Sequence, residues 1–396
     1  MRDRLQKIAE LAQQYIVEAQ RYQKDWYDKS ARQRTFVPGQ NFTSTWRSNL
    51  DPPPDLDHLP GDQQNQMEVE NGAKLCFPQF PNTSCRKPSS PWPQRLLIYI
   101  VCYSISLTTV TLNLLIIISI SHFRQLHTPT NILLLSLAVS DFLVGLVLMP
   151  GEVLRKTSCW FLGDFVCFLY NYLSSIITAS SVGDIVLISV DRYVAICDPL
   201  HYNTRITMNT VKLSVFLCWL YSVSYSFLFV KDDLTQSGRY NSCYGECLFV
   251  IDYFTGLIDL VLTFIVPVTV IVALYLRVFA VAVSQARSMR SHITAVTLQL
   301  SVSLKAKRSE LKAARTLGVL VVVFLMCFCP YYSVSLAGYS VVNSSDASFL
   351  IPMFCFLNSG LNPVIYALFY PWFRKAVKLI VTLQILQPGS CETNML

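Results

Sequence analysis

Five ionisable side chains interrupt long apolar stretches of this 396-residue sequence: Asp141, Glu152, Asp184, Arg192 and Asp259. In an apolar environment a charge costs free energy unless a counter-charge or hydrogen bonds accompany it. Ionisable residues inside membrane-length apolar runs therefore mark cation sites, ion pairs or switches. Asp259, flanked by apolar residues on both sides, is the strongest candidate to bind a cationic group.

The composition places these residues in a membrane protein. Charged residues make up 14% of the chain and hydrophobic residues 52%, with a mean hydropathy of +0.40. A soluble chain carries about 25% charged residues. The formal net charge is only +7. This balance excludes a disordered chain, a collagen-like rod and an ordinary soluble enzyme.

Seven apolar segments are long enough to cross a bilayer, which takes about 20 residues of helix. Their approximate ranges are 95–120, 130–154, 164–196, 209–230, 250–281, 310–340 and 347–369. Backbone groups in lipid must hydrogen-bond within their own segment. We therefore expect an all-α membrane protein, a seven-transmembrane helix bundle, with kinks at Pro150, Pro267, Pro330 and Pro363.

Lys and Arg are unevenly distributed between the two sides of this expected bundle. The loops after the first, third and fifth segments and the C-terminal tail are rich in them, whereas the opposite loops hold only Arg155, Lys156, Lys231 and Arg239. The positive-inside rule predicts a cytoplasmic C-terminus and an extracellular N-terminus. We expect a multi-pass protein of the plasma membrane. A glycosylation sequon at Asn82 falls on the outer side.

A change in composition near residue 67 divides the chain. We expect a polar leader at 1–66, an extracellular segment at 67–94, the membrane domain at 95–380 and a cytoplasmic tail at 381–396. The leader lacks a signal-peptide pattern, and residues 2–30 have the spacing of one solvated helix. Residues 19–39 resemble the region behind the integrase core of retroelement polyproteins. We favour a gene-model fusion without function, with Met67 as the start, over a nucleic-acid-associated remnant.

Six of the 13 cysteines fall on the predicted outer side, where disulfides persist. They are Cys76, Cys85, Cys159, Cys167, Cys243 and Cys247. Cys167 tops the third segment and Cys247 precedes the fifth, so we expect these two to pair. A second disulfide, Cys85–Cys243, would tie the N-terminal segment to the loop. A metal site at Cys243 and Cys247 is disfavoured because no histidine stands nearby.

Motifs on the segments follow an informative order. Asp191-Arg192-Tyr193 closes the third segment, and Asn362-Pro363-Val364-Ile365-Tyr366 lies in the seventh. With Asn113, Trp219, Pro267 and Phe324-x-x-Cys327-x-x-Pro330, they resemble the rhodopsin-like G-protein-coupled receptors over residues 95–380. The pattern from Asn358 to Phe373, the 127–145 stretch and the pair Cys243/Cys247 resemble the trace amine-associated receptors, and among them a fish-type olfactory member.

The resemblance assigns roles to two buried polar clusters. Asp141 is expected to bind an allosteric sodium ion, the only cofactor we expect; the alternative is a carboxylate held by protein hydrogen bonds alone. Its expected partners are Ser181, Asn358, Ser359 and Asn362. Arg192 is expected to pair with Asp191 and Glu310 at rest and to meet Tyr275 and Tyr366 when active. The remaining residues of this activation switch are Tyr193, Pro330 and Pro363.

The resemblance also implies a short amphipathic eighth helix at Pro371–Lys378. It would lie on the inner leaflet, where Trp372 and Phe373 would anchor it in membrane lipid.

The sequence departs from the family pattern where the ligand should bind. The usual aspartate, seven residues after Cys167, is replaced by Ser174. Phe328 stands in place of a tryptophan in the sixth segment, and Phe356 in place of a tyrosine in the seventh. The usual anchor for an amine is therefore absent.

Asp259 is the expected replacement. It lies eight residues before Pro267, about 12 Å farther out along a helix. A ligand ammonium would pair with its carboxylate, and aromatic faces attract cations. The expected ligand-binding set is Asp259, Ser174, Thr178, Phe328, Tyr331, Tyr332 and Phe356. The alternatives are a water-filled vestibule around Asp259 or a protein donor.

The other two acids receive plainer interpretations. Near the outer end of the second segment, Glu152 is expected to be solvated. Asp184 is expected to be structural and bonded to Trp219 or to a hydroxyl on the second segment.

The sequence thus predicts an olfactory receptor for a small-molecule amine that activates a heterotrimeric G protein, of the stimulatory type and in sensory cilia if the family pattern holds. A receptor with a non-amine ligand, or one that does not signal, is the main alternative. A transporter would be expected to contain internal repeats, and an enzyme a nucleophile–base pair or metal ligands. Neither feature is visible, and we expect no nucleic-acid partner.

Overall fold

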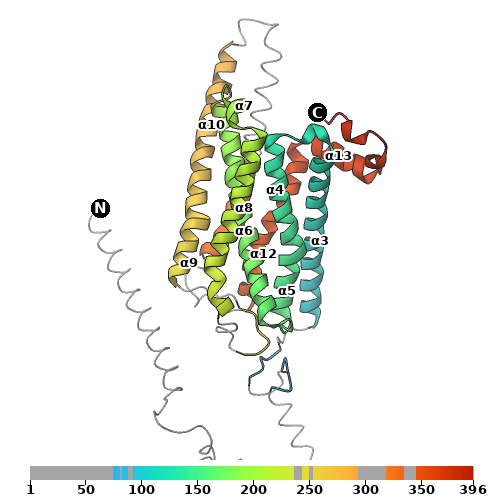
Figure 1. Ribbon diagram of the computed structural model, residues 1–396, viewed down its shortest axis with the longest axis vertical. Helices are drawn as coiled ribbons and strands as arrows, with labels where there is room; N and C mark the ends of the chain where they lie inside the picture. The colour runs from blue at the N-terminus through green and yellow to red at the C-terminus, as the bar shows by residue number, and fades with distance from the viewer. Residues whose placement is uncertain are drawn as a thin grey trace, which may run out of the picture. The chain divides into compact units, whose positions relative to one another are not determined.

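The computed structural model describes residues 75–80, 83–87, 92–235, 243–248, 253–292, 318–333 and 345–395. Long helices run side by side through most of this part of the chain (Figure 1). In chain order they are α3 (Trp92–His122), α4 (Pro129–Leu143), η3 (Val144–Leu148), α5 (Met149–Thr157), α6 (Gly163–Cys197), α8 (Met208–Thr235), α9 (Tyr253–Asp259), η4 (Leu260–Ile265), α10 (Val266–His292), the helix Gly318–Ser333 and α12 (Ser345–Phe369). The short helices are η2 (Arg124–Leu126), α7 (Tyr202–Arg205), α13 (Pro371–Val381), η6 (Gln384–Leu386) and η7 (Ser390–Glu392).

The helices match the expected seven-helix bundle. Six spans among the described residues are long and apolar enough to cross a membrane, and Gly318–Ser333 is a shorter apolar helix in the place of the sixth. The fifth span differs from its predicted range, because α10 continues to His292 into what was expected to be a long loop. The leader, Asn82 and Glu310 lie outside the described residues.

Two of the expected proline kinks coincide with π-helical turns. η3 precedes α5, which carries Pro150 near its start, and η4 precedes α10, which carries Pro267. Proline lacks an N–H and crowds the preceding turn, and a π-helical turn is a common way for a helix to absorb such a change. The pocket-facing turns of these two spans are therefore rotated relative to a straight α-helix.

The two ends of the bundle are built differently. α7 and α13 lie at one end, called here the α13 end, and α5 and α9 at the other, called here the pocket end (Figure 1). α13 packs against α3 and α12. Trp372 and Phe373 are buried in the core cluster rather than exposed to lipid, so their predicted role as membrane anchors is wrong. Packing against α3 gives these rings a protein surface in place of lipid.

Candidate functional site

A cavity of about 150 Å³ opens among α5, α6, α8, the α9–η4 span, the helix Gly318–Ser333 and α12. All seven side chains expected from the sequence to bind ligand line it: Ser174, Thr178, Asp259, Phe328, Tyr331, Tyr332 and Phe356. A cavity of similar volume in another protein accommodates a benzene ring. This one therefore has room for a small aromatic or aliphatic ligand.

Asp259 presents a partly satisfied carboxylate to this cavity. The Tyr225 hydroxyl on α8 donates a hydrogen bond to Oδ1 at 2.8 Å. Tyr225 is a protein donor of the kind considered as an alternative. Apart from Tyr225 and the nearby Thr263 hydroxyl, no described side chain hydrogen-bonds this carboxylate, and no described Lys or Arg forms an ion pair with Asp259. The carboxylate therefore keeps capacity for a cationic group.

The backbone around Asp259 is held by a chain of hydroxyls. Thr263 donates to the Asp259 carbonyl oxygen at 2.6 Å, and its oxygen lies 2.7 Å from the Tyr332 hydroxyl. Since the Thr263 proton is already used, Tyr332 donates to it. Tyr332 also stacks on Phe264 with ring centroids 4.4 Å apart. The fifth span and the helix Gly318–Ser333 are thus fixed to each other beside the carboxylate.

Glu152 is not solvated, and the sequence prediction for it is wrong. It is 2% exposed and accepts from Arg155 Nε at 3.0 Å and from Arg155 Nη2 at 2.8 Å. The Tyr170 hydroxyl lies 3.3 Å from Glu152 Oε2, and the guanidinium lies 6.0 Å from the Tyr170 ring centroid. One helical turn separates Glu152 from Arg155, so the i,i+3 spacing was a visible signal that the prediction overlooked.

Three disulfides close the pocket end. Cys167–Cys247 and Cys85–Cys243, both expected, are present, and Cys76–Cys159 is a third that the sequence prediction missed. Its two cysteines were those left over among the six on the predicted outer side. Residues 83–87 also touch the 243–248 segment through a bridge between Ser84 and Tyr244.

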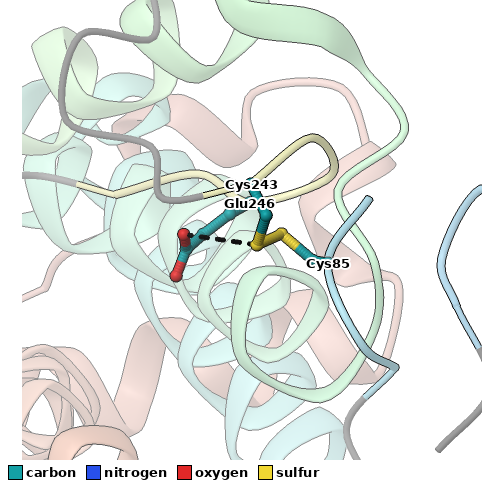
Figure 2. Close-up of side chains that lie close together, drawn as sticks. All are labelled: Cys85, Cys243 and Glu246. Carbon is teal, nitrogen blue, oxygen red and sulfur yellow. Dashed lines mark hydrogen bonds between the residues drawn. A yellow bond between two sulfur atoms is a disulfide. The ribbon is translucent and has the colours of Figure 1, made fainter. Parts of the chain in front are cut away.

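Glu246 is the one carboxylate grouped with cysteines in a metal-like cluster among the described residues. Figure 2 shows it beside Cys85 and Cys243. Both sulfur atoms belong to a disulfide, and a disulfide offers no thiolate to a metal ion. The arrangement is a covalent strap rather than a metal centre.

Two acids in the middle of the bundle are held mainly by neutral groups. Asn362 donates to Asp141 Oδ2 at 2.8 Å, while Asp141 Oδ1 is buried without a hydrogen bond from any described residue. That orphaned oxygen fits a cation. Ser136 donates to Asp184 Oδ2 at 2.9 Å, and Trp219 donates to Ser136 at 3.0 Å. Asp184 thus accepts from a hydroxyl on the second span, which is one of the two partners expected from the sequence.

Of the other residues expected around Asp141, Ser181, Asn358 and Ser359 are buried. The side chain of Asn113 donates to the Ser359 carbonyl oxygen at 3.1 Å, which joins the first and seventh spans beside the acid. Tyr366 is also buried, and its hydroxyl has no partner among the described residues.

Arg192, at the α13 end, is held by side chains of α4 and α6. Its guanidinium pairs with Asp191 and donates to the Thr130 hydroxyl. Asp191, 1% exposed, also accepts from Thr130 at 3.0 Å and from Tyr202 at 2.8 Å. The expected pairing with Asp191 is present, so α6 is fastened to α4 and α7 through one carboxylate.

Three further features belong to this end. Tyr275 lies against Gly318, where an added Cβ would come within 2.4 Å of its hydroxyl oxygen. Tyr193 packs with the buried pair Ile196 and Val278. Just beyond α6, the hydrogen bond with His201 lowers the pKa of the Asp198 carboxyl.

Comparison with known proteins identifies the family. Residues 112–366 match the family of seven-transmembrane receptors of the rhodopsin type. Trace amine-associated receptor 13c of Danio rerio is 38% identical over 337 residues, which cover 82% of this chain and 96% of that receptor. The chain belongs to the trace amine-associated receptors.

Two mammalian relatives agree. Trace amine-associated receptor 7a of Mus musculus is 36% identical over 355 residues, covering 86% of this chain and 98% of that protein. Trace amine-associated receptor 5 of Rattus norvegicus is 37% identical over 335 residues, covering 82% of this chain and 96% of that protein. As a member of this receptor family the chain is not an enzyme, and its cavity is the candidate ligand site of a receptor.

Proposed function

We propose that this trace amine-associated receptor senses small amines, whose ammonium group pairs with Asp259. The observation that carries the proposal is a carboxylate that lines the cavity with hydroxyl partners only, Tyr225 and the nearby Thr263, and no described basic residue paired to it. A half-buried carboxylate without a counter-charge is unfavourable, and a cation that joins it relieves this cost. An ammonium group supplies both the charge and additional donors.

The rest of the cavity suits an organic amine. Phe328, Tyr331 and Phe356 line it beside Asp259. Aromatic faces attract cations and also bury the apolar part of a ligand. Ser174 offers only a neutral hydroxyl, so the Asp259 carboxylate on the fifth span carries the charge recognition.

Signalling would run through the α13 end. Activation requires Arg192 to leave Asp191 and to meet Tyr275 and Tyr366, and the partner would be a heterotrimeric G protein of the stimulatory type. A sodium ion at Asp141 would use the free Oδ1 and stabilise the resting arrangement. When the seventh span moves, Asn362 would exchange its hydrogen bond with Asp141 for other partners.

The orientation follows the distribution of charge in the loops. The disulfide-bonded pocket end would face the outside of the plasma membrane, where disulfides persist, and the α13 end the cytoplasm. We place the receptor in olfactory sensory cilia, as a fish-type member.

The experiment that tests this function is a cAMP reporter assay of surface-matched variants against a panel of mono- and diamines. Asp259→Asn removes a charge-assisted hydrogen bond worth about 1.5–3 kcal/mol. At about 1.4 kcal/mol per decade, the half-maximal amine concentration should rise about ten- to hundredfold. Thr269→Val, which removes an exposed hydroxyl on the same span, is the matched control and should respond like wild type.

Two results would contradict the proposal. An unchanged amine response in Asp259→Asn would remove the anchor. Activation by non-amine probes alone would replace the ligand class.

A further inference from the structure

The α5 side of the cavity carries an ion pair that is separate from Asp259. Glu152 and Arg155 both line the cavity and pair with each other. We propose that Arg155 is a second ligand-contact residue: it donates hydrogen bonds to an uncharged oxygen, of the ether, hydroxyl or carbonyl class, at the end of the amine remote from the ammonium group. This inference rests on the proposed function.

Arg155 has donors to spare. A guanidinium group carries five N–H donors. Glu152 takes one from Nε and one from Nη2. Among the described residues no acceptor is bonded to Nη1, and the side chain is 13% exposed. Since Arg155 lines the cavity, its remaining donors are available to a molecule inside it.

The guanidinium is also held in one place. Glu152 accepts hydrogen bonds from Nε and Nη2 of the guanidinium, and the guanidinium carbon lies 6.0 Å from the centroid of the Tyr170 ring. Tyr170 in turn donates toward the Leu148 carbonyl oxygen at 3.1 Å. Gly151 leaves room for this ring, because a Cβ there would come within 2.3 Å of Tyr170 Cε2. A donor fixed before binding loses little conformational freedom when the ligand arrives.

The charges of the cavity select an uncharged acceptor. Asp259 and Glu152 are negative and Arg155 is positive, so the lining carries a net charge of −1 before ligand binds. A ligand with one ammonium group and a neutral oxygen brings the total to zero. A carboxylate in place of that oxygen would leave −1, and a second ammonium would leave +1. Burying an unbalanced charge is unfavourable, so both should bind more weakly.

The test compares probes that differ by one atom group. In para-methoxyphenethylamine an ether oxygen replaces one methylene of para-ethylphenethylamine. Para-carboxyphenethylamine adds a carboxylate at the same place. Binding is read as the ligand-induced rise in Tm of the solubilised full chain, and signalling as cAMP in cells with matched surface expression.

Arg155→Lys is the informative variant. It keeps the positive charge beside buried Glu152, so the receptor should still fold, but it loses the planar fork and its extra donors. Lys156→Gln is the matched control, because Lys156 is the adjacent cation on the same helix and does not line the cavity. Wild type and Lys156→Gln should prefer the methoxy probe about tenfold over the ethyl probe, as expected for a hydrogen bond to a charged donor. In Arg155→Lys the preference should fall to about threefold or less.

Each outcome decides the inference. A wild-type receptor without preference for the ether, or a preference that survives in Arg155→Lys, overturns it while leaving the amine function standing. A wild-type preference for the carboxylate overturns the choice of an uncharged acceptor. If Asp259→Asn weakens both probes equally while Arg155→Lys removes only their difference, both the proposed function and the inference are supported. If no amine probe raises Tm or cAMP in wild type, both fall together.

Discussion

The two ends of this receptor differ in how they hold a carboxylate, one buried and one half-buried. At the α13 end, Asp191 accepts from Arg192, Thr130 and Tyr202. At the pocket end, Asp259 has only hydroxyl partners among the described residues, Tyr225 and the nearby Thr263, and no described Lys or Arg pairs with it. A saturated carboxylate fastens helices together, whereas one with spare capacity is available to a ligand. The hydrogen bonds alone therefore distinguish a carboxylate that holds helices together, Asp191, from one that can bind a ligand, Asp259.

The ends also differ in what holds them. The pocket end carries three disulfides, and the α13 end relies on hydrogen bonds and packing. Covalent closure keeps the cavity walls in place while a ligand enters. Hydrogen bonds at the other end can be exchanged when the helices move. Changes at the pocket end should therefore act on folding and potency, and changes at the α13 end on basal signalling.

The largest effect should come from opening the pocket end. Cys247→Ser removes the Cys167–Cys247 disulfide, and losing such a bond typically costs about 2–5 kcal/mol. We expect surface labelling to fall to a small fraction of wild type. Cys391→Ser, which changes a cysteine that is free in the tail, should leave labelling unchanged. Near-normal surface expression of Cys247→Ser would show that hydrogen bonds suffice at this end too.

Two glycines allow the same change to be made at each end. A Cβ at Gly151 would come within 2.3 Å of the Tyr170 ring, and one at Gly318 within 2.4 Å of the Tyr275 hydroxyl oxygen. Overpacking of this kind costs about 1–3 kcal/mol. Gly151→Ala should lower amine potency and thermal stability, whereas Gly318→Ala should change basal cAMP with potency largely kept.

Gly256→Ala is the control for both, because nothing lies within 4 Å of the added Cβ. Dose–response curves together with Tm measurements distinguish the two effects. The same phenotype from Gly151→Ala and Gly318→Ala would argue against a division of labour between the ends.

Much of this arrangement was predictable from the sequence. Hydropathy gives the spans, and the positions of Cys167 and Cys247 suggested their pairing. The resemblance to the receptor family, with the spacing from Cys167 and Pro267, placed Ser174 and Asp259 at the same cavity. The spans depend on local hydropathy, whereas the site depends on motifs that the resemblance interprets.

The features that escaped depend on packing between elements. The i,i+3 spacing of Glu152 and Arg155 was visible, but the burial of this pair depends on the packing of Tyr170, and the burial of Trp372 depends on how α13 lies against α3. The π-helical turns η3 and η4 shift side chains by a register that proline alone does not specify. Tertiary contacts of this kind leave no periodic trace in one sequence.

A smaller effect should follow from weakening the hydrogen bonds that hold Asp191. Tyr202→Phe removes one hydrogen bond to Asp191, worth about 0.5–1.5 kcal/mol. Freeing Arg192 becomes easier by that amount, so basal cAMP should rise about two- to tenfold at matched surface expression. Thr204→Ala, on the same short helix but bonded only to the His201 carbonyl oxygen, should not raise it. Basal signalling equal to wild type in Tyr202→Phe would mean that Thr130 and Arg192 alone keep Asp191 engaged.

The smallest effect should be at Ser174, where the usual acid of the family is absent. Ser174 lines the cavity but offers only a hydroxyl, so Ser174→Ala loses at most a neutral hydrogen bond of about 1 kcal/mol. Amine potency should then fall less than about tenfold, below the loss expected for Asp259→Asn. Ser174→Asp adds a second carboxylate to the same cavity, so the charge balance shifts from one ammonium toward two. We expect this variant to favour diamines over monoamines in the cAMP assay. If Ser174→Ala costs more than Asp259→Asn, the charge recognition does not lie on the fifth span, and the contrast between a saturated and an unsaturated carboxylate loses its functional meaning.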